Sequence, residues 1–192
     1  MTEPDGSLPE DFDFDAEFAK AFGDPEEPAP KAILALVLTP LASAPALAGV
    51  CSLAGIEAYA IPTRQGAVAA RIIERDSESE MDELLGQAPQ IARSMASTLS
   101  RTSRYGAVLL VSRLGEGDEG LVGSIAASQW LAGERSAEEV SAGLILAQAD
   151  DVVEQLLLGT VTPADAPQAI SPGRAPRARR GPFRRFRRKP PS

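Results

Sequence analysis

The chain has 192 residues, of which 44% are hydrophobic and only 5% aromatic, enough for one domain with a core of alanine, valine, leucine and isoleucine. It contains one cysteine and no histidine, which excludes an intramolecular disulfide, a Ser-His-Asp triad and the usual zinc and haem sites. The net charge of −8 is strongly segregated. Residues 1–30 carry ten acids and one lysine (−9), residues 31–173 carry seventeen acids and nine bases (−8), and residues 174–189 carry nine bases (+9).

Residues 1–30 form an acidic head whose proline, aspartate and glutamate content is typical of a disordered segment. Within it, Phe14, Phe18 and Phe22 recur every four residues and would line one face of a short helix. Such a helix is marginal alone, so the pattern predicts a motif that folds on a protein partner. The alternatives are packing on its own domain or continued disorder.

Residues 31–160 are predicted to form the α+β core domain. AILALVL, ended by Pro40, is typical of a buried strand. Ser43 to Ala54 indicates a small-residue helix, with Pro45 in its first turn and Gly55 at its end. Cys51 then becomes a small core residue.

The rest of the core continues as hairpins and helices. IEAYAI and AVAARII flank a turn and predict a hairpin, and a second hairpin is predicted around GEGDEG. Between them, Ser77 and Glu80 form a capping-box pattern that opens a helix carrying Met81, Leu84 and Leu85. We expect this helix to be interrupted near Pro89 and to continue with Ile91, Met95 and Leu99 on its buried face.

Ser136 and Glu139 repeat the capping-box pattern, which predicts a long helix to about Leu158. Its buried stripe would contain Val140, Leu144, Ile145, Val152, Val153, Leu156 and Leu157. The predicted order is βαββαββα. Its first six elements match the ferredoxin-like split βαβ arrangement, with an added strand and helix.

The stretch from Ala32 to Ile56 contains no charged residue and is long enough to span a bilayer. Pro40, Pro45 and Gly49 interrupt it, which favours a buried strand followed by a helix. We therefore expect a cytoplasmic protein, with peripheral membrane association left open. The alternative is a single-pass membrane-associated protein that spans at about residues 32–56.

The sequence predicts no catalytic centre, cofactor or metal site. Glu116, Asp118 and Glu119 share one loop, but the loop lacks the alternating ligands of a calcium loop and is interpreted as a solvated turn. The stretch RSMASTLSRTSR places hydroxyls beside arginines. These hydroxyls could accept phosphate, or they could form the polar face of a helix. We expect a protein that is not an enzyme.

Residues 161–192 are predicted to be a disordered tail, rich in proline and arginine. Its cations suit phosphates, and its phenylalanines can stack on bases or enter a headgroup layer. The predicted polyanion-binding residues are Arg177, Arg179, Arg180, Phe183, Arg184, Arg185, Phe186, Arg187, Arg188 and Lys189.

These features together predict an adaptor or regulatory protein. Its basic tail would bind a polyanion, either nucleic acid or anionic lipid, and its acidic head would dock a protein. Head and tail have opposite charges of equal size, so head-to-tail self-association is a further hypothesis. A merely solvated tail is the simpler alternative.

Overall fold

The computed structural model describes residues 32–113, 115–117 and 120–174, and these residues confirm the predicted α+β domain. Within them, six strands form one antiparallel sheet in the order β2-β3-β1-β4-β7-β8, and two short strands form a separate hairpin. The strands are β1 (Ile33–Thr39), β2 (Tyr59–Thr63), β3 (Gly66–Ile73), β4 (Ala107–Ser112), β5 (Gly115–Gly117), β6 (Gly120–Val122), β7 (Ile125–Leu131) and β8 (Glu134–Arg135). The helices are α2 (Ala44–Leu53), α3 (Ser77–Leu84), α4 (Gln90–Ser100), α5 (Ala142–Leu146) and α6 (Asp151–Leu157).

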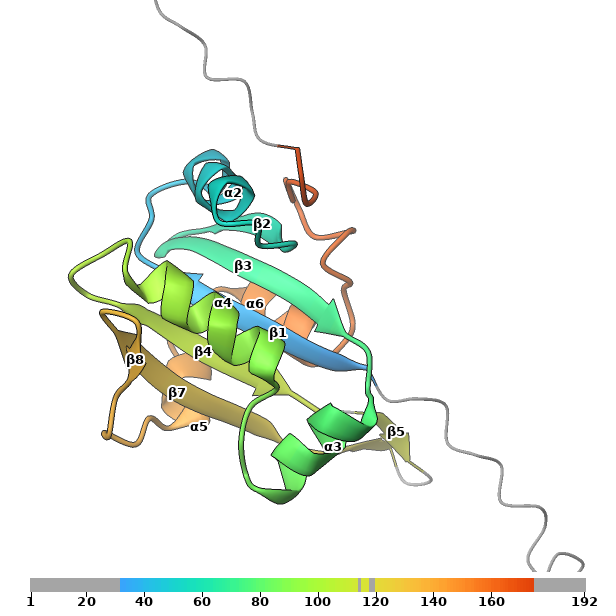
Figure 1. Cartoon of the computed structure of the whole chain (residues 1–192). Coiled ribbons are helices and arrows are strands. Elements are labelled where there is room, and N and C mark those ends of the chain that lie inside the picture. The colour runs from blue at the N-terminus through green and yellow to red at the C-terminus, as the bar shows by residue number, and fades with distance from the viewer. Residues whose placement is uncertain (1–31, 114, 118–119, 175–192) are drawn as a thin grey trace, which may run out of the picture. The chain divides into compact units, whose positions relative to one another are not determined.

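The order β2-β3-β1-β4 is that of the ferredoxin-like split βαβ arrangement. In the middle of the sheet, Val37 of β1 lies between Ala69 of β3 and Leu109 of β4. β7 pairs with the free side of β4, with Leu109 opposite Ser128. This is the added strand that the sequence predicts (Figure 1).

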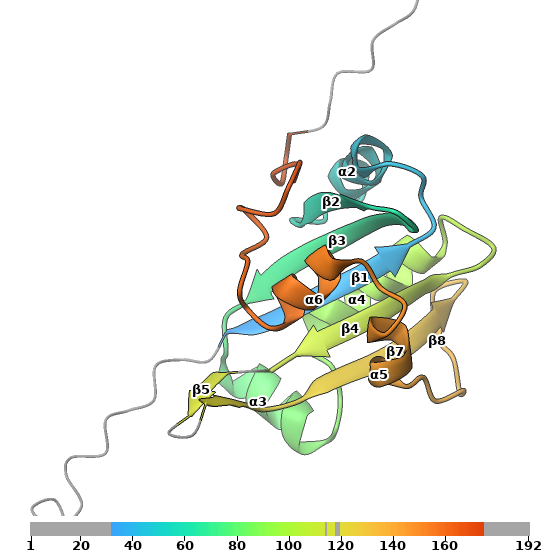
Figure 2. The ribbon, with the colours of Figure 1, turned by 180° about the vertical axis from the view of Figure 1, so that it is seen from behind.

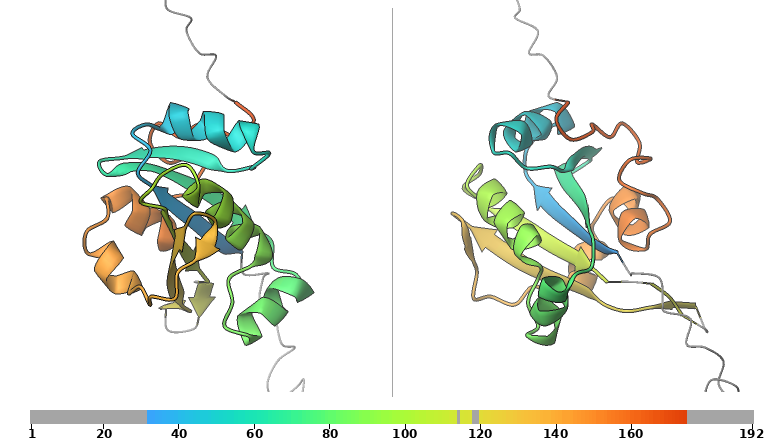
Figure 3. Two further views of the ribbon diagram at one scale, coloured as in Figure 1. Left: turned by 60° about the vertical axis from the view of Figure 1, so that its left-hand side comes forward. Right: turned by 45° about the vertical axis from the view of Figure 1, so that its right-hand side comes forward.

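Helices cover both faces of the sheet because alternate residues of each strand point to opposite sides. Ile33, Ala35 and Val37 are buried in one core cluster with α2 and α4, whereas Leu36 is buried in another with α6. Figure 2 shows α5 and α6 on the face opposite α2 and α4, and Figure 3 shows the sheet between these layers.

The uncharged stretch 32–56 folds as the strand and helix that its prolines predict. The Ser43 hydroxyl oxygen accepts a hydrogen bond from the Ala46 N–H at 3.4 Å, which caps the start of α2. After the helix, Gly55 adopts a φ of +67°. The helix has ten residues, and no helix in the described part of the chain is long and apolar enough to cross a membrane.

Cys51 lies on the buried face of α2 and is 2% exposed, which confirms its prediction as a core residue. Burial raises the pKa of its thiol to about 11, from the ordinary value of 9.0. The thiol is therefore protonated in the folded protein at pH values where an unfolded chain would carry a thiolate.

The free energy of unfolding is expected to fall between pH 9.0 and about 11 because of this thiol. Below that window both states hold the proton, and within it the unfolded state loses the proton first and gains stability. The loss approaches about 3 kcal/mol at the top of the window, at about 1.4 kcal/mol per unit of pKa difference. Denaturant unfolding of the wild type and Cys51→Ala across this pH range measures it. Parallel pH curves for the two proteins would contradict the assignment.

The region after β3 contains two helices, and their break confirms the one predicted near Pro89. The predicted capping box is one residue off, because Asp76 and Ser79 form it in place of Ser77 and Glu80. The Ser79 N–H donates to Asp76 Oδ1 at 2.8 Å, and the Asp76 N–H donates to Ser79 Oγ at 2.9 Å.

α4 buries Met95 and Leu99 as predicted, but it does not bury Ile91. Ala92, Met95, Ala96 and Leu99 are buried, whereas Ile91 is 42% exposed. The two alanines allow the helix to approach the sheet closely, and Ile91 consequently lies beside this contact. On α3, Met81, Leu84 and Leu85 are also exposed.

The long helix predicted from Ser136 to Leu158 is wrong. The Ser136 N–H donates to the Gln129 carbonyl at 2.8 Å, beside the β7–β8 pair, so this residue extends a strand pairing and caps no helix. The region instead contains α5, which begins after Ser141, and α6. In the predicted stripe, Leu144 is 68% exposed, while Val153, Leu156 and Leu157 are buried as expected, under the sheet.

α6 is fastened to the sheet by polar contacts at both ends. Before its first residue, the Asp150 carboxylate accepts hydrogen bonds from the Arg64 backbone N–H and side-chain Nε in the β2–β3 turn. These contacts, the backbone bond above all, hold the pKa of Asp150 below its usual value. At the other end, the buried Ser112 hydroxyl donates to the Leu157 carbonyl at 2.7 Å.

The packed chain continues beyond residue 160, where the sequence predicts a tail. Ala166 is 5% exposed and belongs to the core on the α6 face. Ile170 then pairs with Ala60 of β2 through two backbone hydrogen bonds of 2.9 and 3.0 Å. The sequence did not indicate this packing, because the segment is rich in proline and polar residues and forms no regular helix or strand. The last residue that the structure describes is Arg174.

Candidate binding groove

The residues predicted to bind partners lie outside the described residues. Phe14, Phe18 and Phe22 belong to residues 1–31, and all ten predicted polyanion-binding residues belong to residues 175–192. The backbone of Glu116 lies in β5, whereas Asp118 and Glu119 are not described. The candidate site that the structure does present is a groove that was not predicted.

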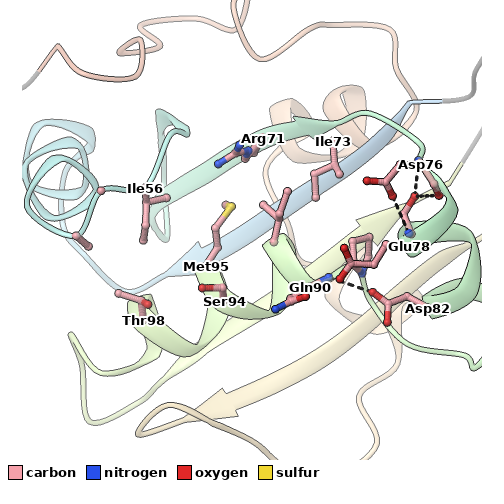
Figure 4. A pocket seen from close by; sticks show the side chains of 15 residues that line it. Ile56, Arg71, Ile73, Asp76, Glu78, Asp82, Gln90, Ser94, Met95 and Thr98 are labelled. Carbon is pink, nitrogen blue, oxygen red and sulfur yellow. Dashed lines mark hydrogen bonds between the residues drawn. The ribbon is translucent and has the colours of Figure 1, made fainter.

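This groove has a volume of about 380 Å³ and lies between the end of α2, the strand β3 and the helices α3 and α4 (Figure 4). We call it the α3–α4 groove. The lining residues that matter for its chemistry are Ile56, Arg71, Ile73, Asp76, Glu78, Asp82, Gln90, Ile91, Ser94, Met95 and Thr98.

The floor of the groove is apolar. Ile73 at the end of β3 and Met95 in the middle of α4 are 5% and 3% exposed, and Ile56 is half-buried after α2. Ile91 is more open to solvent at the start of α4. These side chains come from three elements that the split βαβ topology brings to one face of the sheet.

Two carboxylates at the α3 side are fixed by hydrogen bonds. Asp76 caps α3, and the bond from the Ser79 backbone N–H is the main reason why the pKa of Asp76 is below its usual value. Asp82 accepts from the Gln90 N–H at 3.2 Å and forms an ion pair of 3.1 Å with Arg93. Asp82 therefore joins α3 to α4 at one end of the groove.

The charged groups of Glu78 and Arg71 are held less firmly by neighbouring groups than the carboxylates of Asp76 and Asp82. Glu78 is exposed, and within the described residues it forms no ion pair. Arg71 projects from β3 (Figure 4), and its side chain is 29% exposed, with Nη2 3.7 Å from Glu57 Oε2. The lining thus contains three carboxylates and one guanidinium group, and its balance is negative.

The hydroxyls of α4 divide into two groups. Ser97 Oγ donates to the Gly133 carbonyl at 2.7 Å, and Ser100 Oγ accepts from the Gly133 N–H at 2.9 Å, so both hold the β7–β8 turn. Ser94 and Thr98 instead line the groove (Figure 4). The hydroxyls of this helix therefore serve two places, the β7–β8 turn and the groove.

The arginines at the opposite side of α4 are held by neighbouring protein groups. A recess of about 50 Å³ is lined by Arg93, Arg113 and Arg135, among others. Arg113 donates from Nη2 to the Gln87 carbonyl at 2.7 Å, and its Nε lies 3.9 Å from Glu83 Oε2. Arg93 is paired with Asp82. Neither Arg93 nor Arg113 lines the groove, so the positive charge of these arginines does not add to its lining.

An apolar floor with an acidic rim suits a ligand that carries cations and apolar groups together, such as an arginine-rich segment with aromatic residues. Among the described residues, no group of three or more His, Cys, Asp or Glu could hold a metal ion. The sequence signal for the groove was the acidic run SESEMDEL beside a helix with Ser94 and Thr98 four residues apart. This signal does not show that both helices line one groove together with Ile73.

No protein-family model, no curated protein and no solved structure matches this chain.

Proposed function

We propose that this chain is a non-enzymatic adaptor or regulatory protein. Its basic tail binds a phosphate-bearing polyanion, and its acidic head docks a protein partner. The observation that carries the proposal is the charge segregation, −9 over residues 1–30 and +9 over residues 174–189. The core between them serves as a scaffold.

The places where the described chain begins and ends support a scaffold role. The chain enters the sheet at Ile33, beside Ile73, and its described part ends at Arg174, after the contact of Ile170 with β2. These two places are well separated on the domain (Figures 1 and 2). Head and tail can therefore engage different partners without competing for space at their attachment points.

The residue types of the tail suit phosphate groups. Eight of its nine cations are arginines, which bind phosphate oxygens in pairs of hydrogen bonds. Phe183 and Phe186 stand among these arginines and can stack on unpaired bases or enter a headgroup layer. Binding of this kind depends strongly on salt and little on sequence.

The head would dock through Phe14, Phe18 and Phe22, which lie on one face if the segment folds as a helix. Asp13, Asp15 and Glu17 near its start suit the positive end of the helix dipole. The partner that fits this motif has an apolar groove with a basic border.

The full chain is expected to bind single-stranded RNA with an affinity that falls steeply as salt rises, with a log–log slope of up to about −6 if all nine cations contact phosphate. A variant that ends at Arg174 is expected to bind at least about a hundredfold more weakly. Fluorescence anisotropy with labelled RNA measures both. Strong binding by the shortened variant would contradict the proposal.

Parallel measurements identify the class of polyanion and the role of the aromatic residues. Duplex DNA, and vesicles with and without anionic phospholipid, replace the RNA in otherwise identical titrations. A Phe183→Ala/Phe186→Ala variant keeps every charge. If unpaired bases are the ligand, this variant loses affinity for single strands and retains its affinity for duplex DNA.

A further inference from the structure

Ile170, near the end of the described chain, packs against the same core cluster as the floor of the α3–α4 groove. Ile170 pairs with Ala60 in antiparallel orientation, and the next residues form a turn in which the Arg174 N–H donates to the Ser171 carbonyl at 3.2 Å. Ile56, which lines the groove, lies three positions before Tyr59, the first residue of β2. Ile170 and Ile56 also pack against the same core cluster. In Figures 1 and 2 the last described residues lie beside α2.

The remaining chain is long enough to fill the groove. Residues 175–192 are eighteen residues, which extend up to about 60 Å at roughly 3.3 Å per residue. Phe183 is nine residues beyond Arg174, a reach of roughly 30 Å. Along α4, the lining from Gln90 to Thr98 covers only about 12 Å at 1.5 Å per residue.

The chemistry of the tail complements the groove at each point. The rim carries the exposed carboxylate of Glu78 beside Asp76 and Asp82, and residues 175–192 carry eight cations without an acid. The floor offers the exposed side chain of Ile91 beside the largely buried Met95, and the tail supplies two phenylalanines between its arginines. By contrast, the acidic head would be repelled by the same rim.

We propose that the basic tail, residues 175–192, binds in the α3–α4 groove of its own molecule, with its arginines at the Glu78 rim and Phe183 or Phe186 over Met95 and Ile91. A polyanion competes with the groove for the same arginines, so the groove regulates access to the tail. This regulation rests on the proposed polyanion binding, whereas the contact between tail and groove can exist without it.

Tethering makes such a weak contact effective. A segment joined by a short flexible linker experiences an effective concentration in the millimolar range. If the tail is free for about one tenth of the time, its apparent affinity for a polyanion falls about tenfold. Screening by salt weakens the contact, because the charges at the rim are exposed to solvent.

A charge reversal in the groove tests the contact in the full chain. Glu78→Lys/Ser94→Lys changes two exposed side chains and leaves the Asp76 cap and the Asp82–Arg93 pair in place. The matched control is Glu139→Lys/Ala137→Lys, which adds the same charge at exposed positions outside the groove lining. NMR spectra of both variants and the wild type, recorded without polyanion at low and high salt, report on the Phe183 and Phe186 amides.

The expected result is that the groove variant at low salt shows the tail signals that the wild type shows at high salt, while the control resembles the wild type. The groove variant should also bind RNA about tenfold more tightly than the control. If the tail signals of the groove variant change but none of the proteins binds RNA, the proposed polyanion function is refuted and the contact between tail and groove still stands. Identical tail signals in all three proteins would overturn the contact.

Two other binding modes of the tail would give different results. If the tail pairs with the acidic head, deletion of residues 1–30 shifts the tail signals and the groove variant does not. If the tail fills the groove of a second copy, the signals change with protein concentration. Either result would overturn the proposal.

Discussion

Replacing Gly106 with alanine is expected to lower the free energy of unfolding by about 3 kcal/mol or more. Gly106 has a φ of +71°, which costs an alanine roughly 1–2 kcal/mol. A Cβ at this position would also lie 2.0 Å from the Trp130 carbonyl oxygen. Because that oxygen belongs to the strand paired with β4, the ladder between β4 and β7 must shift to make room. Denaturant unfolding of the full chain measures the change.

Two other glycines serve as matched controls. Gly159 has nearly the same φ, +74°, but nothing lies within 4 Å of a Cβ added there, so Gly159→Ala isolates the cost of the backbone conformation. Gly49 lies inside α2, also with open space around it, and Gly49→Ala should stabilise the protein by about 0.5–1 kcal/mol. Equal losses for Gly106→Ala and Gly159→Ala would show that the close approach to Trp130 has no energetic consequence.

Truncation after Thr160 is expected to destabilise the core by about 3–5 kcal/mol more than truncation after Arg174 does. The segment between these points contributes the buried Ala166 and the half-buried Val161 and Ile170, and burial of a large aliphatic side chain contributes about 1.5–3 kcal/mol. It also contributes the two backbone hydrogen bonds to Ala60.

Thermal and denaturant unfolding of the two shortened chains beside the full chain provide the measurement. Ile170→Ala in the full chain is the control, since it keeps the backbone pairing and removes most of the side chain. If both truncations unfold like the full chain, residues 161–174 do not belong to the core. This comparison also decides which shortened chain is suitable for measurements of polyanion binding.

Local sequence signals were sufficient for most of the sheet and its first helices. The run AILALVL, the Ser43 and Pro45 start of α2, and the break near Pro89 all act within a few residues of one another. These features depend mainly on residues that are close together in the sequence, so the resulting elements can be predicted without knowledge of the fold.

The later part of the core depends on partners far away in the sequence. Ser136 has a good capping pattern, but its N–H pairs with Gln129 across the sheet edge. The Asp150 carboxylate likewise accepts hydrogen bonds from Arg64, which is 86 residues away in the sequence, and these bonds fix the start of α6. The groove was unpredictable for the same reason: Arg71, Glu78 and Ser94 come from three elements that meet only once the sheet has formed.

The contact between Ile170 and Ala60 also affects how molecules behave towards one another. β2 is the outermost strand on its side of the sheet, and such a strand can template the addition of a foreign strand. Here Ile170 occupies the backbone groups of Ala60, and Pro62 has no N–H to donate. On the other side the sheet ends with β8, which is only two residues long. The β2 border therefore offers no free ladder around Ala60, and we expect this side of the sheet to resist edge-to-edge pairing at high concentration.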